Sequence, residues 1–205
     1  MTSDPDIIQI EAAPDRSLSG YLRRVRTQTF ILAAFVAIIW LVELADWLIF
    51  DHSLDAYGIK PRTLEGLKGI FFMPFLHASF GHVLSNTVPF IVLGALVIMR
   101  RTRDFFIVSV IIIIVSGLGV WLFGGANTVH IGASALVFGY LGFLFLRAYF
   151  EWSLASIVVA VAVGLMYSGL IWGVLPIYSG VSWQGHLFGF LGGALAAYLL
   201  TRRRK

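Results

Sequence analysis

The chain has 205 residues, of which 59% are hydrophobic, and its mean hydropathy is +0.87. Both values lie outside the range of soluble globular proteins and indicate a membrane protein. The net charge of +4 comes from a few clusters of basic residues, not from a general basic surface, which argues against nucleic-acid binding. The chain has no cysteine, which excludes disulfides, thiol catalysis and thiolate metal sites.

The N-terminal part of the chain contains one predicted membrane span. Residues 1–29 are polar and include four arginines, so they are predicted to form a cytoplasmic tail. Residues 30–50 are an apolar run of about the 20 residues needed to cross a bilayer, longer than the apolar region of a signal peptide. In the following connection, residues 51–75, Gly58 and Pro61 prevent a continuous helix. A connection of this length is more often functional than idle.

The rest of the chain divides into five further predicted spans. Residues 105–146 contain no Lys, Arg, Asp or Glu, yet they are too long for one crossing and are broken by Gly124 and Gly125. We therefore expect an all-α membrane domain over residues 30–200, followed by a basic C-terminal segment, residues 201–205. The six predicted spans are residues 30–50, 82–99, 105–124, 134–149, 154–175 and 185–200.

The distribution of basic residues predicts the orientation of this domain. With the N-terminal tail on the cytoplasmic side, all but three of the fifteen Lys and Arg lie on that side. An excess of basic residues in the short flanking segments is typical of the cytoplasmic face. Both termini are therefore expected to be cytoplasmic.

Helical rise predicts that several polar residues share one depth in the membrane. The second, fourth and sixth spans each end near an arginine, Arg100, Arg147 or Arg202, that marks the cytoplasmic boundary. Above that boundary, Ser134 lies about 20 Å, Asn86 about 21 Å and His186 about 24 Å, in an apolar core about 30 Å thick. His82 lies one turn above Asn86. Because unsatisfied polar groups in hydrocarbon are costly, this convergence predicts a wet pocket that opens to the extracytoplasmic side.

These side chains have the chemistry of a serine hydrolase. A neutral imidazole, here His186, can take the proton of the Ser134 hydroxyl during attack and return it to the leaving amine. His82 and Asn86, at positions i and i+4 of one helix, can donate hydrogen bonds to an oxyanion. The backbone N–H of Ser134 is a third donor.

Glycines on two spans predict close helix contact. Gly185, Gly189 and Gly193 follow the small-xxx-small pattern that lets membrane helices approach each other. Gly139 and Gly142 are candidates for the facing surface. Such contact would bring Ser134 and His186 together.

Some of the polar residues also have purely structural interpretations. Ser134 alone is compatible with a packing surface, since Gly-Ala-Ser clusters are common in membrane helices. Glu43 and Asp46 are interpreted as an interfacial pair near the outer surface, with partnership to the site as the alternative. His52 and His130 are interpreted as loop residues.

Three motifs occur in order at the second, fourth and sixth predicted spans: His77-x4-His82-x3-Asn86, Gly132-x-Ser134 and Gly185-His186-x2-Gly189. Together they resemble the rhomboid intramembrane serine proteases. The Gly58-Ile59-x-Pro61-Arg62 loop and the run of residues 75–78 are similar to bacterial members. The resemblance covers residues 55–198.

The resemblance implies a six-helix rhomboid fold with a catalytic dyad, Ser134 and His186, and no third carboxylate. It assigns the oxyanion site to His82, Asn86 and the Ser134 backbone. Substrates would be single-span membrane proteins, cleaved in or near the outer part of the span, and no metal or cofactor is implied. The protein would lie in the bacterial cytoplasmic membrane, where residues 176–183 and the fifth span would gate access. The supporting residues would be Gly132, Phe138, Gly185, Gly189 and His77.

Two residues depart from the rhomboid pattern. Ala135 follows the serine where many members have glycine, and Phe138 stands where a tyrosine commonly packs on the catalytic histidine. Phenylalanine keeps the stacking surface but lacks the hydroxyl, so activity is expected to survive with altered tuning of His186.

Two other functions remain open at this point. A non-proteolytic rhomboid-like protein that binds membrane helices would be compatible with these departures. A proton-linked transporter could use His82, His186, Asp46 and Glu43, although the paired halves common in transporters are absent from the sequence.

Overall fold

The computed structural model describes residues 17–177 and 180–202 and is helical, as predicted. The described residues contain no β-strand apart from one isolated bridge, between Ile59 and His130. Residues 1–16 of the predicted tail and 203–205 of the basic segment lie outside the described residues. The helices, in chain order, are α1 (Leu18–Leu48), η1 (Leu54–Tyr57), α2 (Leu64–Phe72), η2 (Met73–Phe75), α3 (Phe80–Ile98), α4 (Thr102–Phe123), α5 (Ser134–Glu151), α6 (Leu154–Met166), η3 (Ser168–Val174) and α7 (Trp183–Arg202).

Several of these helices suit a membrane. Within the described part of the chain, α1, α3, α4 and α5 are long and apolar enough to cross it, and the bent pair of α6 and η3 makes a fifth candidate. The helix α7 is long enough but less apolar, because it carries Gln184, His186 and four glycines. The chain is thus an all-helical integral membrane protein; the six-span count and the cytoplasmic termini remain predictions.

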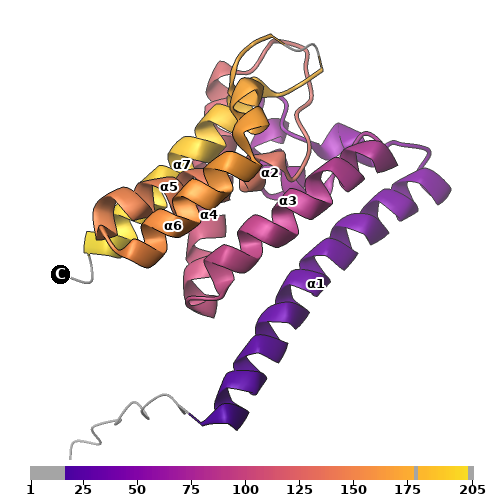
Figure 1. Ribbon diagram of the computed structural model, residues 1–205. Coiled ribbons are helices and arrows are strands. Elements are labelled where there is room, and N and C mark those ends of the chain that lie inside the picture. Colours follow the sequence, from indigo (N-terminus) through magenta and orange to yellow (C-terminus); the bar gives the residue numbers. More distant parts are fainter. Residues whose placement is uncertain (1–16, 178–179, 203–205) are drawn as a thin grey trace, which may run out of the picture.

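The first helix begins inside the predicted tail. Ser17 caps α1, its hydroxyl accepting a hydrogen bond from the Gly20 N–H at 3.1 Å. With 31 residues, α1 is about 46 Å long, more than the apolar core of a bilayer. The Gln28 amide donates to the carbonyl of Ile98 at 2.7 Å, so Gln28 lies level with the end of α3. The preceding turns extend past the bundle, as Figure 1 shows.

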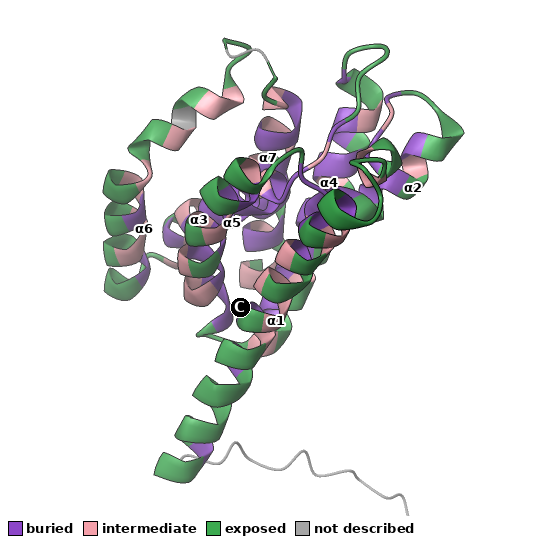
Figure 2. Cartoon of the chain, turned by 90° about the vertical axis from the view of Figure 1, so that its right-hand side faces the viewer, coloured by how far each residue is buried: buried purple, intermediate pink, exposed green. Residues whose placement is uncertain are grey.

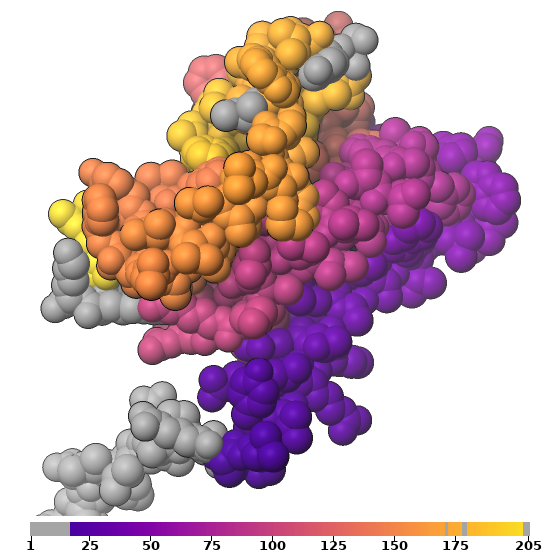
Figure 3. Space-filling model, viewed as in Figure 1, coloured from indigo at the N-terminus to yellow at the C-terminus, as the bar shows by residue number. Residues whose placement is uncertain are grey.

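The fifth predicted span, residues 154–175, is not one straight helix. The α-helix α6 ends at Met166, and the chain continues as the 3₁₀-helix η3 after a bend of 67°. Gly169 and Gly173 lie in the second part, where their low helix propensity weakens an α-helix. Figure 3 shows α6 and η3 in orange beside α3 in magenta on the viewed face.

The centre of the bundle is α5, most of whose residues are buried, in contrast to the exposed start of α1 (Figure 2). Its contact with α7 is made by backbone. Three glycines of these helices have a carbonyl of the other helix at the position that a Cβ would take: Gly142 (against Phe190), Gly189 (against Ala135) and Gly193 (against Gly139). Only glycine permits this approach, which places the start of α5 beside the start of α7.

Two of the predicted contact glycines face elsewhere. A Cβ on Gly139 would meet the Ile112 side chain of α4, although the Gly139 carbonyl does contact α7. A Cβ on Gly185 would meet Ser182 and Val120, not α5. The predicted ladder on α7 therefore contributes Gly189 and Gly193 to the contact with α5.

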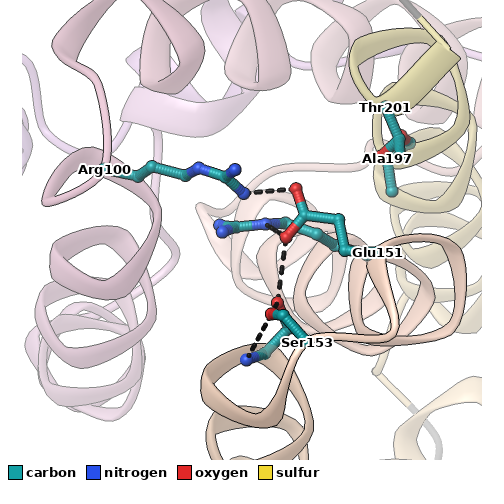
Figure 4. A network of polar contacts seen from close by, with 7 residues as sticks. Arg100, Glu151, Ser153, Ala197 and Thr201 are labelled. Atoms are coloured by element: carbon teal, nitrogen blue, oxygen red, sulfur yellow. Dashed lines mark hydrogen bonds and ion pairs between the residues drawn. The ribbon is translucent and has the colours of Figure 1, made fainter. Parts of the chain in front are cut away.

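An ion cluster joins three helix ends at the opposite end of α5 (Figure 4). The Glu151 carboxylate accepts hydrogen bonds from Arg100, which follows α3, from Arg147 at 3.0 Å and from the Ser156 hydroxyl at 2.9 Å. Ser153 caps α6 by accepting from the Ser156 N–H at 3.2 Å. The start of α6 is thereby fixed to α5 and to the turn between α3 and α4.

Candidate active site

Ser134 is the first residue of α5, and the loop before it has a specific backbone. Gly132 has φ +116°, a conformation that side chains rarely permit, and a Cβ there would lie 2.8 Å from two ring atoms of His82. The Gly132 N–H donates to the carbonyl of Met73 at 2.9 Å. Because Ser134 begins a helix, its own N–H has no intrahelical acceptor and points toward the space before the helix.

The structure brings Ser134 and His186 together. The Ser134 Oγ lies 2.9 Å from His186 Nε2, and His186 Nδ1 lies 2.8 Å from the carbonyl oxygen of Gly173. The imidazole stacks on Phe138, with ring centroids 4.0 Å apart and planes 8° from parallel. No carboxylate of the described residues forms a hydrogen bond with His186. The imidazole of His186 is thus a base within hydrogen-bond distance of the Ser134 hydroxyl, and Phe138 supports one face of its ring.

A cavity of about 760 Å³ opens beside this pair and is also lined by His82 and Asn86 of α3. The side-chain nitrogen of Asn86 is buried and has no hydrogen-bond partner among the described residues. A buried donor without a hydrogen-bond partner lowers the stability of the fold by about 1–3 kcal/mol. The presence of such a donor at Asn86 therefore indicates a functional role for this side chain. The arrangement can supply a hydrogen bond to an oxygen atom bound next to Ser134.

His77 supports the loop before Ser134. It is buried, and its Nε2 accepts a hydrogen bond from the Ala133 N–H at 3.2 Å. Its ring meets His82 edge to face, with centroids 4.9 Å apart. His77 therefore contacts both the loop and a residue that lines the cavity.

Ala135 and Phe138, the two residues that depart from the rhomboid pattern, both pack against neighbouring side chains. Ala135 is buried in an apolar cluster with Ile59, Ile70, Met73 and Val120. Its carbonyl faces Gly189, so the extra methyl group points away from α7. Phe138 provides the stacking surface expected of it.

The sequence did not predict the role of His130, which connects three loops. Its Nδ1 lies 2.6 Å from the Ser182 hydroxyl and its Nε2 lies 2.8 Å from the Thr128 hydroxyl. Its backbone pairs with Ile59 through two hydrogen bonds of 3.0 Å. Ser182 in turn accepts from the Gly185 N–H at 3.4 Å. A single histidine in a loop carries no sequence signal for such a role.

We predict that His130 makes stability depend on pH. Burial lowers the pKa of His130 below the unfolded value of about 6.5. Below pH 6.5 the unfolded state therefore binds more protons, and the stability contributed by neutral His130 is lost as the pH falls toward the folded pKa. Unfolding in detergent at pH 7.5 and 5.5 should show a smaller loss on acidification for His130→Asn than for the wild type. An equal loss on acidification in the two proteins would contradict this prediction.

Glu43 and Asp46 lie apart from this site. Both side chains are buried, and neither lines the cavity. Asp46 accepts a hydrogen bond from the Leu54 N–H at 2.9 Å. Burial, together with the nearby Asp46 carboxylate, raises the pKa of Asp55 to about 6. These acidic groups belong to the junction of α1 with the first loop, which weakens the interpretation as a transporter.

Comparison with known proteins decides the family. The family model for the Rhomboid domain matches residues 65–203, which include all of α3, α4, α5, α6 and α7. The chain belongs to the rhomboid family. The matched region contains Ser134, His186, His82 and Asn86, so the resemblance stated from three short motifs is confirmed over most of the chain.

Several similar proteins come from bacteria. An uncharacterised protein of Mycobacterium bovis is 42% identical over 178 residues, which cover 83% of this chain and 74% of the relative. An uncharacterised protein of Mycobacterium leprae is 40% identical over 181 residues, or 83% and 70% of the two chains. A Bacillus subtilis protein named "Putative rhomboid protease YdcA" is 27% identical over 203 residues, or 90% and 98%.

Proposed function

We propose that this rhomboid-family chain is an intramembrane serine endopeptidase. The observation that carries the proposal is the 2.9 Å approach of Ser134 Oγ to His186 Nε2, at a cavity that also receives an unpartnered Asn86 amide. A hydroxyl, a base and a free donor around one cavity are the parts that acyl transfer requires.

The proposed reaction has two steps. His186 takes the proton of Ser134 as its oxygen attacks the scissile carbonyl, and then gives that proton to the leaving amine, so that an acyl-enzyme forms. Water, activated by the same histidine, then hydrolyses the acyl-enzyme and restores Ser134. Asn86, His82 and the Ser134 N–H would hold the oxyanion of both tetrahedral intermediates, each donor contributing about 2.7–4 kcal/mol.

The proposed substrate is the transmembrane helix of a single-span membrane protein, cleaved in or near the outer part of the span. Ser134 is the first residue of α5 and Glu151 is the last, and the basic residues Arg100 and Arg147 both bind Glu151 at that far end. Under the positive-inside rule this arrangement supports our proposal that the site opens toward the extracytoplasmic side of a bacterial cytoplasmic membrane. No metal or cofactor takes part in the proposed reaction.

The test uses the purified protein in liposomes with a single-span reporter and, in parallel, a fluorophosphonate that reacts with activated serines. The proposal expects reporter cleavage by the wild type and covalent labelling of Ser134, located by mass spectrometry, with neither in Ser134→Ala. Labelling without cleavage would indicate an unsuitable reporter and still support an activated serine. If the wild type shows no labelling and no cleavage, the proposal is overturned in favour of a non-proteolytic protein that binds membrane helices.

We predict that Asn86→Ala lowers kcat by about 10²–10³-fold without loss of stability, because its amide has no partner in the resting protein and acts only on the oxyanion. Reporter cleavage and thermal unfolding in detergent measure the two effects. Leu84→Ala, two residues earlier in α3 and not in the lining of the cavity, is the control and should keep kcat. A matching fall of stability and activity in Asn86→Ala would contradict the predicted role.

A further inference from the structure

We propose that the backbone carbonyl of Gly173 acts as a positioning group for His186, so that catalysis depends on the packing of η3 against α7. This inference rests on the proposed function, since it assigns the group that orients the proposed base. The observation is the 2.8 Å distance from His186 Nδ1 to the Gly173 carbonyl oxygen, on the side of the ring away from Ser134.

The carbonyl determines which nitrogen of the imidazole carries the proton. A carbonyl oxygen only accepts hydrogen bonds, so Nδ1 of the neutral ring must donate to it. The other nitrogen, Nε2, is then left with its lone pair directed at the Ser134 hydroxyl, 2.9 Å away. This is the tautomer that a general base needs. Serine hydrolases with a catalytic triad obtain the same result from a carboxylate.

Among the described residues, the ring has no other orienting hydrogen bond. Phe138 stacks on one face and restrains the tilt of the imidazole, but a phenyl ring has no oxygen to accept from Nδ1. Stacking does not distinguish the two ring orientations that differ by a half-turn about the Cβ–Cγ bond. The hydrogen bonds to Ser134 and to Gly173 select one of them.

Residue 173 must be glycine for this contact to form. A Cβ at that position would lie 2.8 Å from Cζ of Phe138 and 3.1 Å from His186 Nδ1, both closer than ordinary contacts. The other glycine of η3, Gly169, has no atom within 4 Å of the place of a Cβ. The close approach is thus specific to the residue whose carbonyl faces His186.

The element that carries this carbonyl is attached to the bundle less firmly than α5 or α7. It continues α6, whose outer face is exposed and which buries only Ser156 and Val163. If η3 moves away from α7, His186 loses its acceptor and its fixed tautomer while Ser134 stays in place. The catalytic pair is therefore complete only when η3 is packed against His186 and Phe138.

The test compares Gly173→Ala with Gly169→Ala. Reporter cleavage should show kcat reduced about tenfold or more in Gly173→Ala, the effect of losing one hydrogen bond of the base, and unchanged within about twofold in Gly169→Ala. ¹⁵N NMR of histidine-labelled protein, with His186 assigned through His186→Asn, should show Nδ1 protonated in the wild type and in Gly169→Ala. In Gly173→Ala the two tautomers should be mixed.

A second variant weakens the Gly173 carbonyl as an acceptor without adding the methyl group of Gly173→Ala. Replacing Val174 by its α-hydroxy acid turns the Gly173 carbonyl into an ester carbonyl, a weaker acceptor of unchanged shape. It should lower kcat and shift the tautomer ratio in the same direction, and it remains informative if Gly173→Ala does not fold.

The outcomes separate this inference from the proposed function. Protonation of Nε2 in the wild type, or an ester variant with unchanged kcat and tautomer, would overturn the role of Gly173. Equal losses in Gly173→Ala and Gly169→Ala would also overturn it, because they would indicate general loosening of η3. A wild type with the expected tautomer but without labelling at Ser134 would overturn the proposed function alone.

Discussion

Alanine at Ser134, at His186, or at both positions is expected to lower kcat by a similar factor, on the order of 10⁴ or more. The two residues act as one unit, because the base has no role without the hydroxyl and the hydroxyl is a weak nucleophile without the base. The effects should therefore not multiply. Single-turnover cleavage of a membrane reporter by the two single variants and the double variant measures this directly.

The Ser134→Ala variant should keep its fold. Ser134 is the first residue of α5, and in this variant His186 still stacks on Phe138, so the temperature of thermal unfolding in detergent should change by only a few degrees. An additional large loss of kcat in the double variant would contradict the predicted joint action.

Alanine at Gly193 is expected to give the largest loss of stability among the glycine substitutions of the bundle. Its Cβ would coincide with the Gly139 carbonyl and press on the Phe143 N–H, which are backbone atoms that move only if α5 and α7 separate. Overpacking of this kind costs about 3 kcal/mol. Unfolding by SDS titration in mixed micelles measures the loss.

Gly81→Ala is the matched control. Gly81 also lies in a helix, but the nearest atom to its Cβ position is the Ser79 hydroxyl at 3.8 Å. This variant should be unchanged or up to about 1 kcal/mol more stable, because alanine has the higher helix propensity. Equal stability of Gly193→Ala and Gly81→Ala would show that α5 and α7 are not in backbone contact.

Much of the candidate site could be predicted because its residues lie on regular helices. A constant rise per residue placed Ser134 and His186 at similar depths, and the structure joins them at 2.9 Å. The small-residue pattern indicated which helices touch, since Gly189 and Gly193 do contact α5. The family followed from the order, spacing and predicted depth of three motifs.

The parts that could not be predicted depend on backbone and loops. Nothing in a glycine at position 173 shows that its carbonyl will face an imidazole, and the loop partners of His130 are far from it in sequence. The bend after Met166 and the start of α1 at Leu18 were missed because apolar runs do not reveal where helical geometry changes. Capping by Ser17 is a local signal that could have placed that start.

The cluster around Glu151 has a mechanical consequence for α6. Arg100 and Arg147 donate hydrogen bonds to the Glu151 carboxylate, which also accepts one from the Ser156 hydroxyl. The start of α6 is therefore fixed at the end of the bundle that is remote from the catalytic pair. Any displacement of α6 would therefore be largest near Met166, where α6 meets η3, the segment that contacts His186. The helices that carry Ser134 and His186, α5 and α7, are instead held together by their glycine contacts.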